Sequence, residues 1–572
     1  MSTKIMTGAE VLIKSLERKG VEYIFGLSGG AAIPLFDALI DSPIQLVLVR
    51  HEQGATHMAD GYARSTGKPG VVLVTSGPGA TNTITGLLTA NMDSAPMIVL
   101  TGQVPTFGLG KDLFQEADIF GMTAPAVKHS YLVKNTADIP RIVDESYYIC
   151  STGRPGPVLI DLPKDITSAP CDADIDNVEM DIPGYTIPSM CKLEEVVKMA
   201  ELINRAKKPV ILCGHGALIS KAEEQIAILA KKMGAAVITT LLGKGAFPET
   251  DEVSMGFVGM HGTAYANKAM QHCDLFLNIG SRWDDRFTPA KIEEFIPKAK
   301  KLHIDIDPAE FNKVVVPDAG AIGDAKLIVE ELIKHIDQLE TTEWIKEVTK
   351  YKKKFPLSYK IQGGLKAQQV IDEAYKVCKG NAIVSVDVGQ HQMWAAQFFK
   401  TSRPNTWICS GGAGTMGFGF PAAIGAQFGN PKELVIAICG DGGFQMTEAE
   451  LSTVMIHKLP VKILLIDNKY LGMVRQWQQL FFDNRQSGVD LEGNPDFVKL
   501  AEAYGMKGFR IKRQADITKV LTKAFAFDGP CLIHAEVVKE DNVFPMIPSG
   551  ATVDKMLLEA PKQALEKPVG ST

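Results

Sequence analysis

Short apolar runs alternate with longer amphipathic stretches along almost the whole chain of 572 residues. Such runs, bounded by Gly, Pro, Asn or Asp, are typical of buried strands, and the stretches between them have helical periodicity. Strands that alternate with helices form parallel sheets with helices on both faces. We therefore predict an α/β protein with three doubly wound, Rossmann-like parallel-sheet domains.

The apolar runs fall into three blocks. The first block covers residues 1–180, with strands expected at 23–26, 45–49, 71–75 and 97–101. The second covers residues 190–345, with strands expected at 210–213, 236–239, 275–279 and 302–306. The third covers residues 365–540, with strands expected at 383–386, 434–439, 463–466 and 532–537. An acidic, Pro-containing link is expected between the first two blocks, a lysine-rich link at 346–360 between the second and third, and a C-terminal tail at 541–572.

Composition narrows the class of protein. The apolar fraction of 45% and the charged fraction of 22% are ordinary for a globular protein, and the net charge of −6 argues against a nucleic-acid partner. No apolar run approaches the ~20 residues that a membrane span needs, and the amphipathic N-terminus does not resemble a signal peptide. Nine single cysteines without a CxxC pair indicate neither a zinc site nor a disulfide framework, so we expect a cytoplasmic protein.

The segment ICGDGGFQMTEAEL (438–451) is the first with clear chemistry. It places Asp441 after an apolar strand, at the carboxyl end where parallel sheets bind ligands, and two glycines there let the backbone approach a phosphate. The next apolar run leads to Asn468, and a carboxylate with an amide suits Mg²⁺ shared with a diphosphate. The alternative is that these are two ordinary Gly/Asn turns. GDGG by itself favours this alternative, but GDGG together with the Asn468 turn at this spacing favours a metal and diphosphate site.

From Gly442 to Asn468 there are 25 intervening residues, 443 to 467. GDG followed by Asn at this distance resembles the signature of thiamine-diphosphate enzymes. The family usually has a second Asn where this chain has Asp467, which is not the ligand position. The resemblance implies thiamine diphosphate and Mg²⁺ as cofactors, with Asp441, Asn468 and the main chain of Tyr470 holding the metal.

Two upstream segments, VDVGQHQMW (386–394) and SGGAGTMGFGFPAAIGA (410–426), are similar to the same family. The resemblance implies that Gln390 and His391 contact the diphosphate and that Met416 props the cofactor's rings into a bent shape. Without their motifs, a loop histidine and a core methionine would be the preferred interpretations. The thiamine-diphosphate contacts implied for this block are Gln390, His391, Gly414, Met416, Gly442, Gly443, Asn468, Gly472 and Met473.

Glu52 follows the second expected strand and begins a helix, where a Glu is usually only a favourable N-terminal charge. GPGATN (77–82) follows the next strand, and both segments resemble the pyrimidine-binding half of thiamine-diphosphate enzymes. A carboxylate hydrogen-bonded to the pyrimidine N1′ promotes loss of the C2 proton, so we assign Glu52 this role. In the family, the halves that face one cofactor come from different subunits, which implies an obligate homodimer or tetramer.

Further segments resemble acetohydroxyacid (acetolactate) synthases, among them 101–133, 259–267, 281–289 and 471–482, and the resemblance covers roughly residues 5–550. It implies decarboxylation of pyruvate and transfer of the two-carbon unit to pyruvate or 2-ketobutyrate, in branched-chain amino-acid biosynthesis. The active-site residues implied beside Glu52 are Phe114, Gln115 and Lys164. The substrate residues implied are Arg286 for the acceptor carboxylate and Trp477, Met260 and Val474 for its alkyl pocket; core packing is the alternative for Trp477.

The middle block carries a second cofactor motif. SRWDDRFTP (281–289) resembles the Arg-Phe-Asp-Asp-Arg motif of FAD-containing synthases, with Trp283 in place of the commoner Phe. Because the net reaction transfers no electrons, a structural FAD is expected. The FAD contacts implied are Arg154, Gly259, His261, Gly262, Thr263, Gly280, Arg282, Asp284, Arg286, Asp305, Asp307 and Asp324.

Two other interpretations remain open. A FAD-free catabolic acetolactate synthase, or another thiamine-diphosphate 2-ketoacid lyase or oxidase, shares the thiamine motifs but not the flavin motif. A non-enzymatic nucleotide-binding protein shares only the tandem Rossmann-like pattern. The 32 residues after Glu540 (572 − 540) show no regulatory domain, so valine feedback, if present, is expected from a separate regulatory small subunit.

Overall fold

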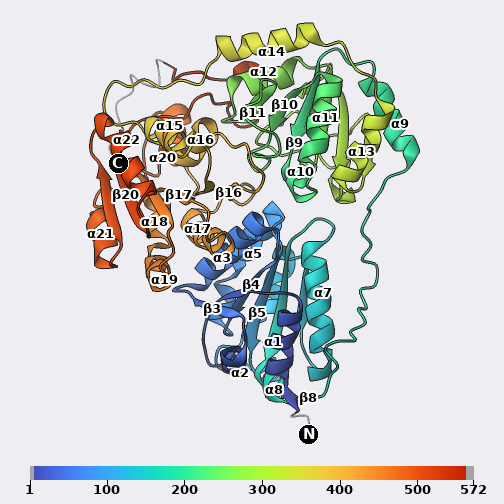
Figure 1. Ribbon diagram of the computed structural model, residues 1–572, viewed down its shortest axis with the longest axis vertical. Coiled ribbons are helices and arrows are strands. Elements are labelled where there is room, and N and C mark those ends of the chain that lie inside the picture. Colours follow the sequence, from blue (N-terminus) through green and yellow to red (C-terminus); the bar gives the residue numbers. More distant parts are fainter. Residues whose placement is uncertain (1–4, 562–572) are drawn as a thin grey trace.

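In the computed structural model, which describes residues 5–561, the chain forms three six-stranded parallel sheets flanked by helices (Figure 1). This confirms the predicted α/β class with three doubly wound parallel sheets. The first block lies at the bottom of Figure 1, the middle block at the upper right and the third block at the upper left. Within residues 5–561, no helix combines the length and apolar character that a membrane crossing requires.

The first block contains a sheet with the order β3-β2-β4-β5-β7-β6 and a small antiparallel pair, β1 with β8. Its strands are β1 (Met6–Thr7), β2 (Tyr23–Leu27), β3 (Gln45–Leu48), β4 (Gly70–Val74), β5 (Met97–Gln103), β6 (His129–Leu132), β7 (Pro157–Pro163) and β8 (Pro170–Cys171). Its α-helices are α1 (Gly8–Arg18), α2 (Ile33–Ala38), α3 (Glu52–Thr66), α4 (Pro78–Thr81), α5 (Ile84–Asp93), α6 (Ile119–Thr123), α7 (Ile139–Ser151) and α8 (Lys164–Ser168).

The middle block has the order β11-β10-β9-β12-β13-β14. Its strands are β9 (Pro209–Cys213), β10 (Ala236–Thr239), β11 (Ser254–Phe257), β12 (Leu275–Ile279), β13 (Lys300–Asp305) and β14 (Ala319–Ile322). Its α-helices are α9 (Leu193–Ile203), α10 (His215–Ile219), α11 (Glu223–Met233), α12 (Ala264–His272), α13 (Ala325–His335) and α14 (Thr342–Lys354). Counted from β9, this is the 3-2-1-4-5-6 order of dinucleotide-binding sheets.

The third block has the order β16-β15-β17-β18-β20-β19. Its strands are β15 (Ile383–Val386), β16 (Trp407–Cys409), β17 (Val435–Gly440), β18 (Lys462–Asp467), β19 (Lys507–Ile511) and β20 (Cys531–Glu536). Its α-helices are α15 (Ala367–Cys378), α16 (Gln390–Phe398), α17 (Gly419–Gly429), α18 (Asp441–Gln445), α19 (Leu451–His457), α20 (Gly472–Phe481), α21 (Phe497–Ala503) and α22 (Ile517–Phe525). Counted along the chain, the first and third sheets share one order, 2-1-3-4-6-5, which differs from that of the middle sheet.

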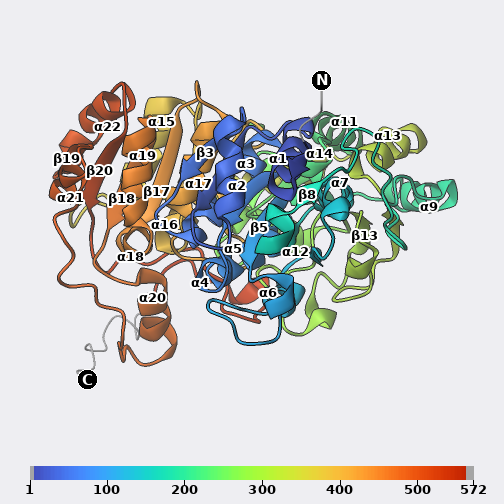
Figure 2. The same ribbon diagram turned by 90° about the horizontal axis from the view of Figure 1, so that it is seen from below.

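The first and third blocks share a hydrophobic core, and their helices α3 and α17 pack against each other between the two sheets (Figure 2). Small residues allow this close approach. A Cβ on Gly61 of α3 would lie 2.0 Å from the carbonyl oxygen of Ala422, and a Cβ on Gly425 of α17 would lie 1.8 Å from that of Met58. Larger side chains at these glycines would force the two blocks apart.

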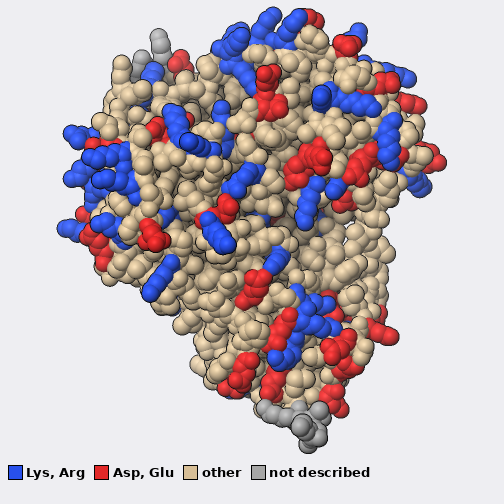
Figure 3. All heavy atoms as spheres, in the orientation of Figure 1, with Lys and Arg blue, Asp and Glu red and all other residues tan. Residues whose placement is uncertain are grey.

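All the strands predicted from the apolar pattern are present within one or two residues of their expected bounds. Besides the two short strands of the β1–β8 pair, the pattern missed β7 and five strands at sheet edges, β6, β11, β14, β16 and β19. The link predicted at 346–360 begins inside α14, which buries Trp344 and Val348 and turns lysines to solvent; these lysines gather at the top of Figure 3. The tail predicted from 541 packs on the protein in its described part, where Ile547 N–H donates to the carbonyl of Met260 at 2.8 Å.

Candidate active site

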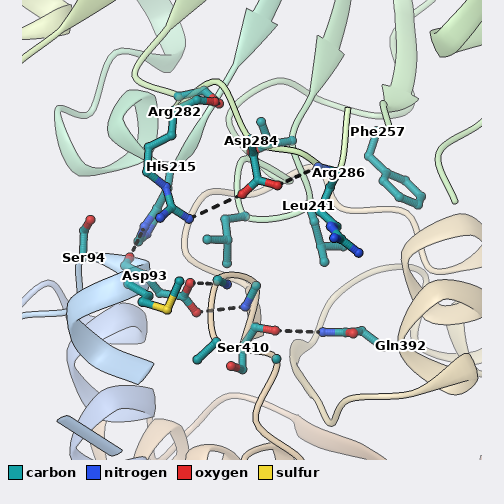
Figure 4. Close-up of a pocket in the computed structure, with 18 of the residues that line it drawn as sticks. Asp93, Ser94, His215, Leu241, Phe257, Arg282, Asp284, Arg286, Gln392 and Ser410 are labelled. Atoms are coloured by element: carbon teal, nitrogen blue, oxygen red, sulfur yellow. Dashed lines mark hydrogen bonds and ion pairs between the residues drawn. The ribbon is translucent and has the colours of Figure 1, made fainter. Parts of the chain in front are cut away.

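A cavity of about 1000 Å³ opens between the middle and third blocks, and residues of the first block reach its edge. Figure 4 shows how its walls meet: Asp93 and Ser94 come from the first block, Arg282 and Asp284 from the middle block, and Ser410 from the third. All the thiamine-diphosphate contacts predicted in the third block line this cavity, together with Asp441 and Tyr470.

Asp441 and Asn468 follow the neighbouring strands β17 and β18, so the parallel sheet brings them to the same edge. Asp441 is buried, and its Oδ2 accepts a hydrogen bond from Nδ2 of Asn494 at 2.7 Å. The same amide donates to Oδ1 of Asp467 at 3.2 Å. Asn468 accepts from the main-chain N–H of Tyr470 at 3.2 Å, which fixes the turn after β18.

Charge is concentrated at this edge. Burial, followed by the neighbouring Asp467 carboxylate, raises the pKa of Asp441 to about 7. Burial acts in the same direction on Asp467, but the hydrogen bond and charge of His534, whose Nε2 lies 2.9 Å from Oδ2, lower the pKa of that carboxyl. Two adjacent buried carboxyl groups with amide and main-chain oxygens nearby form a hard-oxygen donor set, which fits Mg²⁺.

Across the described part of the chain, no three His, Cys, Asp or Glu side chains gather into a metal-binding cluster. The Mg²⁺ ligand set implied for Asp441, Asn468 and Tyr470 has a different composition, with one carboxylate, one amide and one main-chain oxygen. Mg²⁺ usually keeps several waters and takes its remaining ligands from substrate phosphates, so a site with few protein ligands is normal for this ion.

The wall beside Asp441 is built to accept an anion. Helices α16 and α20 begin at Gln390 and Gly472, both lining the cavity, and helix N-termini favour phosphate groups. A Cβ on Gly472 would lie 2.1 Å from Oε1 of Gln390 and 2.7 Å from Nδ2 of Asn468, so a larger residue there would displace both side chains. Burial lowers the pKa of His391 to about 4, and its neutral Nε2 accepts the main-chain N–H of Gly440 at 3.1 Å.

Met416 and the first turns of α20 form the apolar part of the cavity. The Cε of Met416 lies 3.6 Å from where a Cβ on Gly442 would be, so this side chain sits directly over the GDGG turn. Met473, Val474 and Trp477 line the wall beyond it. Trp477 is half-buried and meets Phe481 edge to face, with ring centroids 5.8 Å apart.

The middle block contributes its topological switch point, where β9 and β12 are neighbours and their connections diverge. Gly216 and Gly280 follow these strands and are packed so closely that a Cβ on Gly280 would lie 2.6 Å from Cα of Gly216. His261 also lines the cavity, and its buried Nδ1 has no hydrogen-bond partner. A glycine-walled crevice with an unpaired polar atom fits a dinucleotide such as FAD.

The predicted FAD contacts divide into two groups. Those that line the cavity are Arg154, His261, Gly280, Arg282, Asp284, Arg286, Asp305 and Asp324. The others are Gly259, Gly262, Thr263 and Asp307, which lie outside its lining. Thr263 caps α12 and donates its hydroxyl to Met255, while Asp307 Oδ2 pairs with Arg154 Nη1 at 3.2 Å. Trp283, the departure from the flavin motif, is a core residue packed against Phe276, Phe287 and Phe295.

The predicted substrate residues also line the cavity: Met260, Arg286, Val474 and Trp477. The guanidinium of Arg286 contacts the Asp285 carboxylate, and its main-chain N–H donates to Oδ1 of Asp284 at 2.8 Å. The side chain is about half exposed, so it is accessible from the cavity.

The catalytic residues predicted in the first block follow β3, β5 and β7, on the carboxyl edge of the first sheet. Glu52 is buried at the start of α3, and Asn82 Nδ2 donates to its Oε2 at 3.0 Å. Gln115 has a φ of 60° and lies 2.9 Å from where a Cβ on Gly77 would be. Phe114 is 88% exposed, and Lys164 is exposed after β7. None of these four predicted residues lines the cavity.

Comparisons with known proteins agree with this arrangement. Three family models match: the N-terminal TPP binding domain of thiamine pyrophosphate enzymes at residues 6–122, their central domain at 196–332 and their C-terminal TPP binding domain at 387–535. The acetolactate synthase of Mycobacterium bovis is 45% identical over 96% of this chain and 91% of its own length.

The chain belongs to the acetolactate synthase family of thiamine pyrophosphate enzymes.

Other acetolactate synthases are equally similar along their length. The probable large subunit of Methanocaldococcus jannaschii is 44% identical over 96% of this chain and 95% of its own length. The large subunit of Haemophilus influenzae is 42% identical over 98% of this chain and 99% of its own. The family assignment confirms the resemblance drawn from the GDG–Asn spacing and from the segments around Gln115 and Trp477.

Several residues at the acetolactate synthase site escaped the sequence analysis. Asn494 bridges Asp441 and Asp467, and Asp387 accepts the main-chain N–H of Gly417 at 3.0 and 3.1 Å with its two carboxylate oxygens. Asp387 stands in the motif VDVGQHQMW and could have been found there, as the carboxylate at a strand end. Asn494 lies in a loop without regular pattern, so no local signal pointed to it.

Proposed function

We propose that this protein is a catalytic subunit that decarboxylates pyruvate and transfers the two-carbon unit to pyruvate or 2-ketobutyrate, forming 2-acetolactate or 2-aceto-2-hydroxybutyrate. The observation that carries the proposal is the cavity in which Asp441, Asn468 and Met416 meet Arg286 and the middle block. Similarity to acetolactate synthases over nearly the full chain supports the same reaction. The products place the enzyme in valine, leucine and isoleucine biosynthesis.

In this proposal, bound thiamine diphosphate supplies the nucleophilic carbon and the electron sink for decarboxylation. Asp441, Asn468 and the main chain of Tyr470 would hold Mg²⁺, an ion that prefers such hard oxygen ligands and would supply positive charge for the diphosphate. The neutral His391 and the N-terminus of α16 face the diphosphate. Glu52 would be the residue that holds the pyrimidine ring, and its carboxylate would supply the general acid–base function that activates the cofactor.

The position of Glu52 relative to the cavity supports an assembly of at least two subunits. Glu52 and Gln115 lie outside the lining of the cavity that holds Asp441 and Met416 of the same chain, which supports their supply by a second copy. We therefore propose an obligate homodimer or tetramer with active sites between subunits. Exposed apolar side chains beside the Glu52 site, Phe107, Phe114, Phe120 and Met122, support burial of this edge against another copy.

FAD is proposed as a structural cofactor at the switch point of the middle sheet. Its support is the glycine-walled crevice at Gly216 and Gly280, the unpaired Nδ1 of His261 and the cluster of Arg154 with acidic residues at the strand ends.

The proposal extends to a separate regulatory small subunit, supported by the large-subunit names of the relatives. A cytoplasmic location is proposed because all nine cysteines have free thiols.

Product analysis tests the function. Purified protein with thiamine diphosphate and Mg²⁺ should form acetolactate from pyruvate alone, and both products when 2-ketobutyrate is added. The protein should be yellow from bound FAD. Its product formation should not be accompanied by a matching consumption of oxygen. Synthase activity in a colourless protein would instead support the FAD-free catabolic class, and release of acetaldehyde or acetate as the main product would support a decarboxylase or oxidase.

Trp477→Leu should lower the preference for 2-ketobutyrate over pyruvate as acceptor. The two acceptors differ by one methylene, which an apolar pocket discriminates by roughly 10–200-fold, and the half-buried indole lines the cavity together with Met473 and Val474. Competition between both ketoacids, with products quantified together, measures the ratio. Arg286→Ala is the matched control, because loss of the carboxylate contact should impair both products equally. An unchanged product ratio in Trp477→Leu would return this residue to a packing role.

A further inference from the structure

Asp93, the last residue of α5, extends its carboxylate from the first block to the third. Its Oδ2 accepts the main-chain N–H of Gly411 at 2.9 Å, and its Oδ1 accepts that of Gly412 at 2.6 Å (Figure 4). Arg64 of α3 holds the same carboxylate, with Nη2 3.0 Å from Oδ2, and the side chains of Arg64 and Asp93 are both buried. The turn that Asp93 holds connects β16 to the segment that carries Met416 into the cavity.

Glu450 makes the reverse contact, from the third block to the first. It ends the short 3₁₀ turn Glu448–Glu450 and is buried. Its Oε1 accepts the main-chain N–H groups of Arg50 and His51, both at 3.0 Å, and its Oε2 accepts that of Arg50 at 3.2 Å. The hydroxyl of Thr453 donates to Oε2 at 2.6 Å. Glu52 follows directly after Arg50 and His51, the two residues whose main chain Glu450 holds.

These two contacts occupy equivalent places in two sheets of identical strand order. Each turn follows the second strand of its sheet, β3 or β16, and leads toward α3 or α17. Each carboxylate comes from the connection after the third strand, β4 or β17. Each carboxylate also lies close against a glycine: a Cβ would lie 2.5 Å from Glu450 Oε1 if added to Gly54, and 2.9 Å from Asp93 Oδ1 if added to Gly412.

We propose that Asp93 and Glu450 are reciprocal positioning residues, each fixing through two main-chain N–H groups the turn that carries cofactor-contacting groups of the opposite half. The proposal rests on the proposed function, which assigns Glu52 and Met416 their roles. Hydrogen bonds from N–H groups to a buried carboxylate are stronger than neutral ones, so these turns are held more firmly than an ordinary loop. Misplacement of a reacting group by about 1 Å can cost roughly 10²-fold in rate, so such anchoring has a catalytic consequence.

The two anchors have different expected signatures. Glu450 supports the turn before Glu52, so Glu450→Gln should slow exchange of the C2 proton of bound thiamine diphosphate by about 10–100-fold. The affinities for thiamine diphosphate and Mg²⁺ should stay within about threefold of wild type, because Asp441 and Asn468 are untouched. Exchange into deuterated buffer, followed by NMR after acid quench of the holoenzyme, measures the first quantity.

Asp93→Asn should show the opposite pattern. Both oxygens of Asp93 accept N–H groups, so an amide nitrogen must face one of these donors and loosen the turn before Met416. The concentration of thiamine diphosphate for half-saturation should rise by about 10–100-fold, as for the loss of a charge-assisted hydrogen bond. C2 exchange at saturating cofactor should remain close to the wild-type rate, because Glu52 is still held.

Matched controls separate positioning from general loss of stability. Glu448→Gln changes a carboxylate in the same 3₁₀ turn as Glu450, and Asp60→Asn removes another carboxylate from Arg64. Neither control side chain has a hydrogen bond to the two turns among the described contacts, so exchange and affinity should both stay near wild type. Thr453→Val, which removes only the hydroxyl that orients Glu450, should slow exchange in the same direction by a smaller factor and decides the case if Glu450→Gln does not fold.

The split between exchange rate and affinity is the readout that a purely structural role would not produce. Wild-type exchange in both Glu450→Gln and Thr453→Val would overturn the proposal, as would equal losses in the variants and their controls. These measurements need only bound thiamine diphosphate and its C2 proton. A protein that binds and exchanges normally but forms no acetolactate would therefore overturn the proposed function, not the positioning roles.

Discussion

Glu52→Gln should reduce turnover by on the order of 10²–10⁴-fold at saturating thiamine diphosphate, the usual contribution of a general acid–base group. Gln preserves the shape of the side chain and an oxygen that can accept the hydrogen bond from Asn82, which donates to Oε2 at 3.0 Å in the native protein. It removes the carboxylate charge that a pyrimidine nitrogen would meet. Cofactor affinity should therefore change far less than kcat.

The measurement is the rate of acetolactate formation across a titration of thiamine diphosphate. Glu10→Gln is a matched control, because Glu10 is another carboxylate in the first turn of a first-block helix, where it completes the capping box of α1. It should retain turnover close to wild type. Near wild-type turnover in Glu52→Gln would remove Glu52 from the chemistry and leave it the ordinary role of a negative charge at a helix N-terminus.

Asp441→Ala should raise the Mg²⁺ and thiamine diphosphate concentrations for half-maximal activity together, by at least roughly 10–100-fold, the range known for outer-shell partners of a metal. The carboxylate stands at the carboxyl end of β17 beside Asp467, where burial and that neighbour already disfavour its charge. A bound cation would compensate both carboxylates, and its loss weakens the diphosphate contact at the same time.

Chelation offers a check that does not depend on a variant. Protein stripped of divalent ions and cofactor should be inactive and recover only when both are returned. Asn494→Ala, which removes the amide shared by Asp441 and Asp467 but no proposed ligand, should shift both requirements by a smaller factor. Activity that survives exhaustive chelation would contradict the assignment of this edge as a magnesium site.

The strands that the sequence predicted are mostly those buried in the middle of their sheets, where side chains on both faces must be apolar. Edge strands such as β19 (KGFRI) and β16 (WIC) are polar or very short, so periodicity could not separate them from loops. β7 is buried along its whole length, but prolines at both ends hid it in the pattern. The sequence predicted a link over most of α14, because this helix contains more lysines than buried residues.

At the site, the sequence identified residues that stand in dense local motifs. Asp441, Asn468 and Met416 carry recognisable neighbours, and the structure brings them to one cavity. Asp93 stands outside these motifs, and Glu450 lies at the end of the GDGG segment without any sign there of its partner. Their partners are main-chain N–H groups 318 and 399 residues away, and a main-chain donor leaves no trace in residue type. Only the packing of α3 against α17 reveals these contacts.

The glycine-mediated packing of α3 against α17 also affects how the chain reaches its native state during synthesis. The core shared by the first and third blocks cannot close until α17 has left the ribosome, about 350 residues after α3. At about 5–20 residues per second, the apolar side of α3 waits roughly 20–70 s for its partner while the middle block, whose core is its own, has time to fold. During that interval the apolar side of α3 is exposed to pairing with another nascent chain, so it is a surface that chaperone binding during translation should protect.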